Sequence, residues 1–346
     1  MPKVAVLTGG GDAPGLNAAI RAVIRCASVE GYEVLGVRRG WKGLLNREFQ
    51  PLSLERVDEL LYRGGTILGS SRTNPYKEPN GARTIRETLS SEKIDALVAI
   101  GGEDTLGVAA KLHAEGMPVV GIPKTIDNDL NATQFTIGFA TAVDIVTEAI
   151  DRLRTTSESH DRIMIVEIMG RHAGWLATYA GLAGGADAVL VPEFPMKLEE
   201  LIAIIQKCRA RGKNYSVIAV AEGAEVIDDR GKRLSSASEQ PVDAFGHVQL
   251  GGIGDLLKEI LKKKTGFDTR ATILGHTQRG GSPCAADRIL ATAYGVHAMQ
   301  LVKKREFGKM PALVNGRIAS VPLNEAVAQL KTLTPDVYQL AQVFFG

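Results

Sequence analysis

Residues 94–105, Ile-Asp-Ala-Leu-Val-Ala-Ile-Gly-Gly-Glu-Asp-Thr, pass from a short apolar run directly into two glycines and two carboxylates. Residues 118–129, Pro-Val-Val-Gly-Ile-Pro-Lys-Thr-Ile-Asp-Asn-Asp, repeat this arrangement with a lysine, a threonine and two aspartates after the run. Short continuous apolar runs are typical of strands that are covered on both faces of a parallel sheet. Each polar cluster is therefore predicted to follow the carboxyl end of a buried strand, where α/β proteins bind ligands.

The same pattern continues along the chain in both directions. Between the apolar runs, residues 139–153 and 198–208 carry apolar side chains at steps of three and four, which is typical of helices. Strands that alternate with helices in this way predict parallel α/β units with right-handed crossovers. A chain of 346 residues is too long for one ordinary core, so two domains are expected. The eight predicted strands are Val4–Leu7, Val34–Val37, Leu97–Ile100, Val119–Ile122, Ile163–Ile168, Ala188–Val191, Val217–Val220 and Ala271–Leu274.

The composition argues against several classes of protein. A net charge of +2 and an aromatic content of 5% give no reason to expect a nucleic-acid or membrane-surface partner. Three cysteines, Cys26, Cys208 and Cys284, form no CxxC pair and are expected to be reduced thiols. The chain enters a predicted strand almost at Met1, and no apolar run reaches the ~20 residues that span a bilayer. A cytoplasmic enzyme is the resulting expectation.

The first loop, Thr8–Asn17, contains three consecutive glycines, which permit close approach of an anion to the backbone. The helix expected after it would direct free N–H groups at that anion, with Pro14 in the first helical turn. The loop lacks the GK[ST] of a Walker A motif and the last glycine of a GxGxxG fingerprint. A phosphate site is predicted here; a simple tight strand-to-helix turn is the alternative.

Glu103 is the first candidate ligand for Mg²⁺, because this ion is typically held by one or two carboxylates plus substrate phosphates. The alternative is an acid stabilised by the helix dipole. In the next loop, Asp127 or Asp129 can accept a proton from an attacking hydroxyl, while Lys124 and Thr125 can position phosphate oxygens. The alternative there is a solvated turn.

Further basic side chains lie at the ends of later strands. Guanidinium groups match phosphate oxygens in a bidentate manner, so these side chains could hold a phosphorylated sugar. Each of them taken singly is more often a surface residue. The group consists of Arg162, Arg171, Arg270, His276 and Arg279.

Together these motifs resemble those of the phosphofructokinase family, over a stretch from Val4 to about Arg305. The resemblance implies two α/β/α three-layer, Rossmann-like domains with mainly parallel sheets: a phosphoryl-donor domain of residues 1–138 and 251–303, and a fructose 6-phosphate domain of residues 139–250 and 304–346. It also implies transfer of a phosphoryl group to the 1-hydroxyl of fructose 6-phosphate with Mg²⁺. The matching segments are Gly9–Asn17, Gly69–Arg72, Gly101–Thr105, Thr125–Asp129, Met169–Trp175, Glu222–Gly223 and Leu274–Gly281.

The resemblance also implies a role for individual residues. Asp127 would be the catalytic base, assisted by Thr125 and Arg171. In this family, residues at the positions of Arg162 and Arg270 are typically lent by a neighbouring subunit, so a homodimer or homotetramer is expected. The sugar and the reacting groups would be held by Thr125, Asp127, Asp129, Met169, Gly170, Arg171 and Glu222. The 6-phosphate region would be held by Arg162, Arg270, His276 and Arg279. The donor would be held by Gly11, Arg72, Gly102, Asp104 and Lys124, and the metal by Glu103.

Asp104 and Lys124 bear on which phosphoryl donor is used. The resemblance implies pyrophosphate, because ATP-using members carry small residues at the position of Asp104 and usually glycine at that of Lys124. Two like charges ~4 Å apart at an effective dielectric of ~20 repel by about 4 kcal/mol, roughly a thousandfold in affinity. Asp104 is therefore expected to repel the α-phosphate of a nucleotide from a pocket too short and too acidic for ATP. Glu103, where most members have aspartate, is a departure from the family pattern.

Two alternatives to this function remain: an ATP-dependent phosphofructokinase and a sugar-phosphate sensor without catalysis. A further basic set matches in part the effector site of some bacterial members, although Leu54 and Asp187 depart from it. This set is either a regulatory site or a charge network between subunits. It consists of Arg21, Arg25, Arg154, Arg211 and Lys213.

Overall fold

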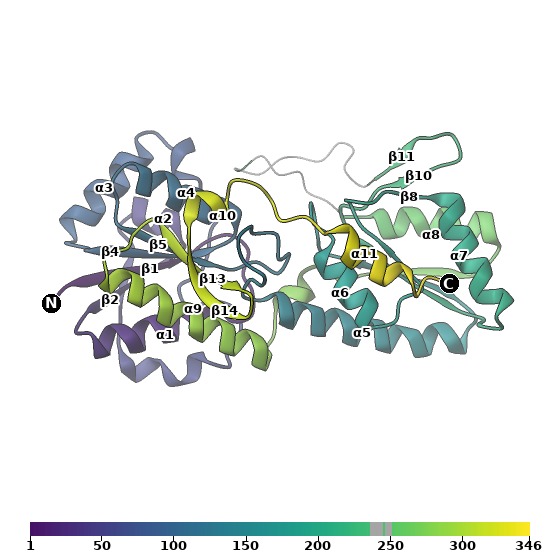
Figure 1. Cartoon of the computed structure of the whole chain (residues 1–346), viewed down its shortest axis with the longest axis horizontal. Helices are drawn as coiled ribbons and strands as arrows, with labels where there is room; N and C mark the ends of the chain where they lie inside the picture. The colour runs from purple at the N-terminus through teal and green to yellow at the C-terminus, as the bar shows by residue number, and fades with distance from the viewer. Residues whose placement is uncertain (236–244, 246–250) are drawn as a thin grey trace. The chain divides into compact units, whose positions relative to one another are not determined.

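The computed structural model describes residues 1–235, 245 and 251–346 (Figure 1). By its internal contacts the chain divides into two compact units. Unit 1 comprises Met1–Thr141, Arg279–Leu330 and the short piece Asp243–His247, of which the structure describes Phe245; unit 2 comprises Ala142–Val242, Val248–Gln278 and Lys331–Gly346.

Unit 1 is built on a five-stranded sheet in the order β3-β2-β1-β4-β5. Four of these strands are parallel, and only β3 pairs with its neighbour in the antiparallel sense. The strands are β1 (Lys3–Thr8), β2 (Glu33–Val37), β3 (Phe49–Leu52), β4 (Ala96–Gly101) and β5 (Val119–Pro123).

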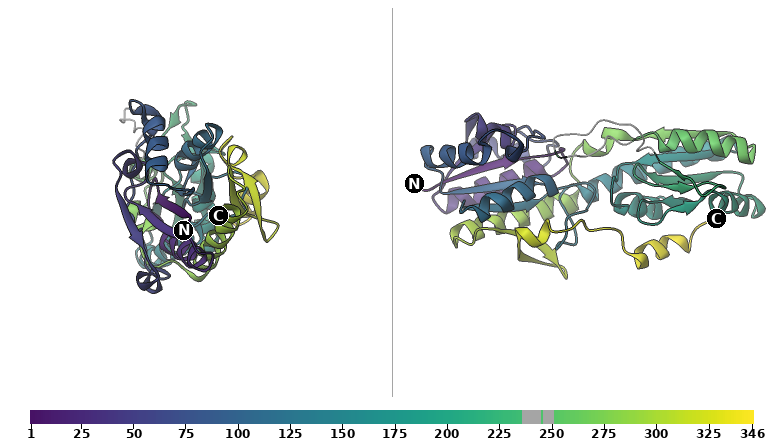
Figure 2. Two further views of the ribbon diagram at one scale, coloured as in Figure 1. Left: turned by 90° about the vertical axis from the view of Figure 1, so that its left-hand side faces the viewer. Right: turned by 90° about the horizontal axis from the view of Figure 1, so that it is seen from above.

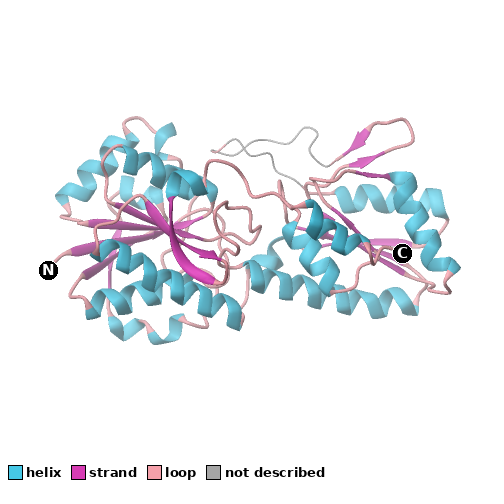
Figure 3. Cartoon of the chain, in the orientation of Figure 1, coloured by secondary structure: helices cyan, strands magenta, loops and turns pink. Residues whose placement is uncertain are grey.

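Alternate residues of β1 enter two different cores, which makes unit 1 a three-layer α/β/α structure. Val4 and Val6 pack with α1 (Leu16–Val29) and α9 (Ala285–Lys303). Ala5 and Leu7 pack with the helices of the other face. Figure 3 shows the strands of this unit lying between helices. The second helical layer consists of α2 (Trp41–Leu45), α3 (Gly81–Ser91), α4 (Glu103–Ala114) and α10 (Leu323–Ala326).

The hairpin of β13 (Lys309–Val314) and β14 (Arg317–Pro322) completes unit 1. Its two strands are drawn in yellow tones in Figure 2. The N–H of Gly308, just before β13, donates to the carbonyl of Val119 in β5 at 2.8 Å. Short 3₁₀ turns lie at η1 (Leu54–Arg56), η2 (Asp58–Leu60) and η3 (Pro75–Lys77).

Unit 2 contains a four-stranded parallel sheet in the order β12-β6-β9-β7. Its strands are β6 (Ile163–Ile168), β7 (Ala188–Leu190), β9 (Ser216–Ala221) and β12 (Thr269–Ile273), and the turn η4 (Gly275–Arg279) follows β12. The helices of this region are α5 (Phe139–Ser159), α6 (Trp175–Ala183), α7 (Leu198–Ala210), α8 (Ile253–Thr265) and α11 (Pro335–Gln342), with a small sheet of β8 (Met196–Lys197), β10 (Val226–Ile227) and β11 (Arg233–Leu234).

The predicted class, mainly parallel α/β, is confirmed, but the division of the chain differs from the predicted domains, chiefly in two long segments; residues 139–141 and the short piece 243–247 also fall in unit 1. Residues 251–278 belong to unit 2, because β12 pairs with β6 and extends that sheet. Residues 304–330 belong to unit 1, because the β13–β14 hairpin bonds beside β5. The sequence does not show which sheet a distant strand joins.

Among the helices that the structure describes, none is both long enough and apolar enough to cross a membrane. The cytoplasmic location stays a prediction.

Candidate active site

Three loops of unit 1 leave the carboxyl ends of neighbouring parallel strands, as the sequence predicts. The loop after β1 contains Gly10 and Gly15 with φ of 75° and 103°, values that only glycine adopts freely. Pro14 was expected in the first turn of the helix, but it lies in a turn before α1, which begins at Leu16. Gly15, in the left-handed conformation, is the N-cap residue of this helix.

Lys124 joins the loop after β5 to this glycine loop. Its Nζ donates to the carbonyl of Gly9 at 3.0 Å and to that of Gly11. The side chain is 3% exposed. Burial lowers the pKa of Lys124 to about 7, and the charge of Arg279 acts in the same direction. The amine of Lys124 therefore lies against the glycine loop of the candidate phosphate site and carries its charge below pH ~7.

Asp127 and Asp129 follow Lys124 in the same loop. Burial raises the pKa of Asp129, and the charges of Asp127 and Glu103 raise it further, while a hydrogen bond from Thr125 opposes the rise. Three carboxylates thus act on one another at the carboxyl ends of β4 and β5. Such a group favours the approach of a proton or a cation.

Asn128 fixes the shape of this loop, a role that the sequence reasoning missed. It lies in the left-handed region with φ of 53°, where asparagine is among the more tolerant residues. Its Nδ2 donates to the carbonyl of Gln134 at 3.1 Å, and its Oδ1 accepts from the N–H of Thr136 at 3.1 Å. Thr136 in turn donates its hydroxyl to the carbonyl of Thr125 at 2.7 Å. The only local signal was an asparagine between two aspartates.

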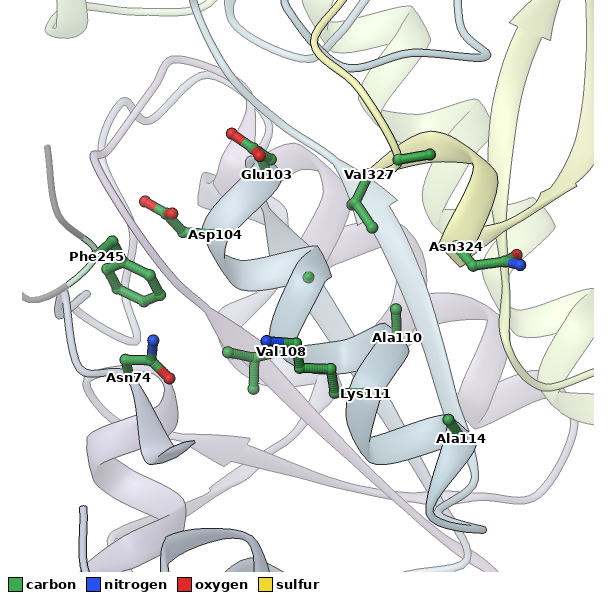
Figure 4. A pocket seen from close by; sticks show the side chains of 12 residues that line it. Asn74, Glu103, Asp104, Val108, Ala110, Lys111, Ala114, Phe245, Asn324 and Val327 are labelled. Carbon is green, nitrogen blue, oxygen red and sulfur yellow. The ribbon is translucent and has the colours of Figure 1, made fainter. Parts of the chain in front are cut away.

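Glu103 and Asp104 form the first turn of α4, directly after Gly102, the N-cap residue. Figure 4 shows both side chains beside a cavity, with Asp104 on the side of Phe245 and Asn74. The cavity has a volume of about 550 Å³. Its wall consists of Asn74, Glu103, Asp104, Gly107, Val108, Ala110, Lys111, Ala114, Phe245, Asn324, Val327 and Ala328.

Close packing connects α4 to the glycine loop. A Cβ placed on Gly9 would lie 2.5 Å from Oγ1 of Thr105, so no larger residue fits without a shift. The N–H of Gly10 donates to the carbonyl of Ser71 at 3.2 Å. Arg72, predicted to bind the donor, therefore follows directly after a residue that contacts the glycine loop.

In unit 2, three predicted sugar-binding segments meet at one edge of the sheet. Met169, Gly170 and Arg171 follow β6, Glu222 follows β9, and His276 follows β12. The N–H of Glu222 donates to the carbonyl of Ile168 at 2.7 Å, which locks two of these segments together.

Two glycines of this edge allow the segments to cross. The N–H of Gly223 donates to the carbonyl of Gly170 at 3.1 Å, and a Cβ at Gly223 would clash with the carbonyl of Arg171. Gly170 itself has a φ of 141°. Larger residues at these positions would separate the predicted sugar contacts.

Arg162 and Arg270 lie at the opposite edge of the same sheet. Arg162 precedes β6, and its Nε donates to Oδ2 of Asp268 at 2.7 Å; Arg270 is the second residue of β12 and reaches the same carboxylate at 3.2 Å. At ~3.3 Å per residue, the length of β6 separates Arg162 from Met169 by ~20 Å. The structure therefore does not bring these two arginines to the other predicted sugar contacts of unit 2.

Arg279 belongs to unit 1. Its Nη1 donates to the carbonyl of Asp12 at 3.3 Å, and a Cβ at Gly11 would clash with the guanidinium. Arg279 was predicted to bind the 6-phosphate region; in this structure its side chain lies against the glycine loop.

The described residues contain no group of three or more His, Cys, Asp or Glu side chains arranged to hold a metal ion unaided. For a hard cation that also binds substrate phosphates, fewer protein ligands suffice.

The sequence pattern that defines the phosphofructokinase family matches residues 3–302, which is most of the chain. The chain belongs to the phosphofructokinase family. The parallel α/β units and the positions of the three loops of unit 1 agree with the expectation drawn from the motifs.

Two curated family members illustrate the similarity. A pyrophosphate--fructose 6-phosphate 1-phosphotransferase of Amycolatopsis methanolica is 56% identical over 346 residues, 99% of this chain and 100% of the relative. An ATP-dependent 6-phosphofructokinase of Corynebacterium efficiens is 46% identical over 346 residues, 99% of each chain.

Among solved structures, Pichia pastoris phosphofructokinase in the T-state is similar, with a TM-score of 0.81 and 33% identity. The match covers 99% of this chain and 36% of that chain, so this chain spans about a third of the Pichia pastoris polypeptide.

Three side chains of the basic set that resembles an effector site of this family make contacts within their own unit. Lys213 pairs with the buried Asp187 at 2.5 Å in unit 2, and Arg25 pairs with Asp58 in unit 1. Arg154 donates to the carbonyl of Gly185 at 3.2 Å. These contacts lie within one chain, and a side chain already paired is less able to bind an anionic effector. Both interpretations of the set, a regulatory site and a charge network between subunits, stay predictions.

Proposed function

We propose that this phosphofructokinase transfers a phosphoryl group reversibly from pyrophosphate to the 1-hydroxyl of fructose 6-phosphate, giving fructose 1,6-bisphosphate and phosphate. The observation that carries the proposal is the group in unit 1 where Lys124 bonds to the glycine loop beside Asp127, Asp129 and Glu103. The 56% identity to a relative named for this reaction supports it.

Asp127 is the proposed base. It takes the proton of the sugar hydroxyl as the oxygen bonds to phosphorus and the bond to the leaving phosphate breaks. Phosphoryl transfer asks the protein mainly for positioning and charge stabilisation, which Thr125, Lys124 and Arg171 are suited to supply. Asp129, whose raised pKa reflects burial beside Asp127, is proposed to orient the acceptor.

Mg²⁺ is the proposed metal, and Glu103 the proposed ligand. The carboxylates present fit this ion. The charges of Asp127 and Glu103 both raise the pKa of Asp129, so the three carboxylates form a region that favours positive charge. When bound, Mg²⁺ would neutralise charge on the donor phosphates. The longer side chain of Glu103 is compatible with direct or water-mediated binding.

Asp104 and Lys124 are the proposed determinants of donor choice, with Gly11, Arg72 and Gly102 as further donor contacts. The carboxylate of Asp104 lines the cavity, where it would repel an additional phosphate. A pocket too short for ATP was expected, yet the described residues leave about 550 Å³ beside Asp104. Discrimination is therefore attributed to charge rather than to lack of volume.

The carboxyl edge of the sheet in unit 2 is proposed to bind the sugar phosphate. Met169, Gly170, Arg171, Glu222 and His276 are its proposed contacts. Arg162 lies ~20 Å away along β6, and Arg270, which pairs in register with Met164, lies ~16 Å away. We propose that they serve the site of a second copy of the chain, in a homo-oligomer. For Arg279, binding of the 6-phosphate region stays a prediction.

An ATP-dependent 6-phosphofructokinase is the second candidate, favoured by the cavity and by the relative of that name at 46% identity. A coupled assay with fructose 6-phosphate, Mg²⁺ and either donor decides between the two. We expect turnover with pyrophosphate and less than about a hundredth of that rate with ATP. Faster turnover with ATP would reverse the proposal.

The double variant Asp104→Gly/Lys124→Gly tests the determinants of donor choice. Removing the carboxylate relieves a repulsion of about 4 kcal/mol, so ATP-dependent kcat/KM should rise by at least about a hundredfold. Asp144→Gly, which also replaces a helical carboxylate but lies exposed on α5 and outside the cavity wall, is the matched control and should leave ATP use unchanged. No gain of ATP activity in the double variant would refute the charge argument.

A further inference from the structure

Gln278 links two segments of the proposed sugar site, and we propose that it is a positioning residue for sugar-phosphate binding. Its side chain is 0% exposed. Its Oε1 accepts from the N–H of Met169 at 3.1 Å, and its Nε2 donates to the carbonyl of Gly275 at 3.0 Å. The inference rests on the proposed function and assigns no contact between Gln278 and the substrate itself.

The position of Gln278 between two backbone segments explains why a carboxamide side chain is favourable there. The ladder between β12 and β6 ends with the bond from the N–H of Leu274 to the carbonyl of Glu167, at 3.0 Å. Past this point the two segments of the chain leave the sheet: the segment after β6 continues to Arg171, and the segment after β12 enters η4. A carboxamide has both a donor and an acceptor, so one side chain can bond a backbone N–H on one segment and a carbonyl on the other.

These bonds hold backbone that carries proposed contacts. Met169 directly precedes Gly170 and Arg171, and Gly275 directly precedes His276. Gly170 and Gly275 both have positive φ, so the chain at these positions has conformational freedom that must be removed before binding. Because Gln278 fixes both segments before the sugar phosphate binds, less backbone conformational entropy is lost on binding.

The competing explanation is that Gln278 only contributes to the stability of unit 2. Tyr338 provides a matched control for that explanation. It is also buried in unit 2, and its hydroxyl donates to the carbonyl of Val189 at 3.0 Å, within β7. Tyr338→Phe deletes a buried bond to a backbone carbonyl without touching the proposed sugar-binding segments.

The experiment measures fructose 6-phosphate binding by calorimetry without donor, together with thermal melting and steady-state kinetics. For Gln278→Met, which keeps the length and removes both bonds, the Kd for fructose 6-phosphate should rise about tenfold. The KM for pyrophosphate should change less than about twofold, because the donor loops of unit 1 are untouched. Tyr338→Phe should melt earlier than the wild type but bind fructose 6-phosphate with unchanged affinity.

Gln278→Asn gives a second test that is independent of the folding of the methionine variant. Its shorter side chain reaches one partner at a time, so the Kd should rise about threefold. Wild-type affinity in either folded variant, or an equal rise in Tyr338→Phe, would overturn the positioning role. If the wild-type protein itself does not bind fructose 6-phosphate, the proposed function fails and the inference fails with it; binding by the wild type separates the two outcomes.

Discussion

Lys124 shows how one buried side chain sets the chemistry of the donor site. A lysine enclosed by backbone carbonyls loses the solvation of its charge, so its pKa falls to about 7. The same burial acts oppositely on Asp129, whose pKa it raises. The loop after β5 thus contains an amine and a carboxyl group whose pKa values both lie closer to neutral pH than they do in water.

A pH dependence follows for Lys124. The charged ammonium is present below pH ~7 and is lost as the pH rises through that value. The advantage of the wild type over Lys124→Met in kcat/KM for pyrophosphate should therefore shrink by up to about tenfold per pH unit above ~7. Taking the ratio of the two enzymes removes the ionisation of pyrophosphate itself. A ratio that stays constant from roughly pH 6 to 9 would contradict the pKa assigned to Lys124.

Asp127→Ser tests the catalytic base. General-base contributions are typically 10²–10⁴-fold, so kcat should fall by about a thousandfold while calorimetric binding of fructose 6-phosphate persists. Asp144→Ser, which changes an exposed carboxylate on α5, is the control and should retain wild-type kcat. Retained turnover in Asp127→Ser would remove Asp127 from the mechanism, and binding without turnover in the wild type would favour the sensor alternative.

At the scale of elements, the start of α5 depends on a residue almost 150 positions away. Asp287, buried at the start of α9, accepts from the N–H of Gly138 at 2.8 Å and of Thr141 at 2.8 Å. The hydroxyl of Thr141 donates to the same carboxylate at 2.5 Å. A carboxylate that caps the positive end of a helix is favourable. The capping residue for α5 comes from another helix, so local sequence at residues 136–139 does not reveal it.

Asp287→Ala should lower the free energy of unfolding by about 3 kcal/mol, because it removes three bonds to a buried charged group. Chemical denaturation measures the loss. The exposed Asp144 again offers a comparison, since Asp144→Ala should change the free energy of unfolding by less than about 0.5 kcal/mol. Equal effects of the two substitutions would show that the capping bonds add no stability.

At the scale of the molecule, the two edges of the sheet in unit 2 carry different groups of proposed contacts. Arg162 and Arg270 share Asp268 at the amino edge, which lowers the pKa of that carboxyl, mainly through the hydrogen bond from Arg162. Along β6, Arg162 lies ~20 Å from Met169, and Arg270, beside Met164, lies ~16 Å from it. If these arginines bind the sugar phosphate, the simplest arrangement is exchange between copies of the chain.

Complementation tests this exchange. Asp127→Ser and Arg162→Ala should each be nearly inactive alone. When the two are co-expressed, mixed dimers contain a site with both residues intact, and about a quarter of all sites should be active. Pairing Asp127→Ser with the double variant Asp127→Ser/Arg162→Ala should restore nothing. Failure of the first pair to regain activity, despite proven mixed oligomers, would mean that Arg162 acts within its own subunit or not at all.

The sequence by itself determined the eight parallel strands of the two main sheets and the loops that follow them, because apolar period, glycine and proline act over a few residues; β3, β13 and β14 were not predicted. The tertiary structure alone decided which distant groups bond: Lys124 with Gly9, Asp287 with Thr141, Gln278 with Met169. It also assigned residues 251–278 and 304–330 to their sheets. The physical reason is that such hydrogen bonds depend on strand order and register, which many weak contacts across the whole core select together.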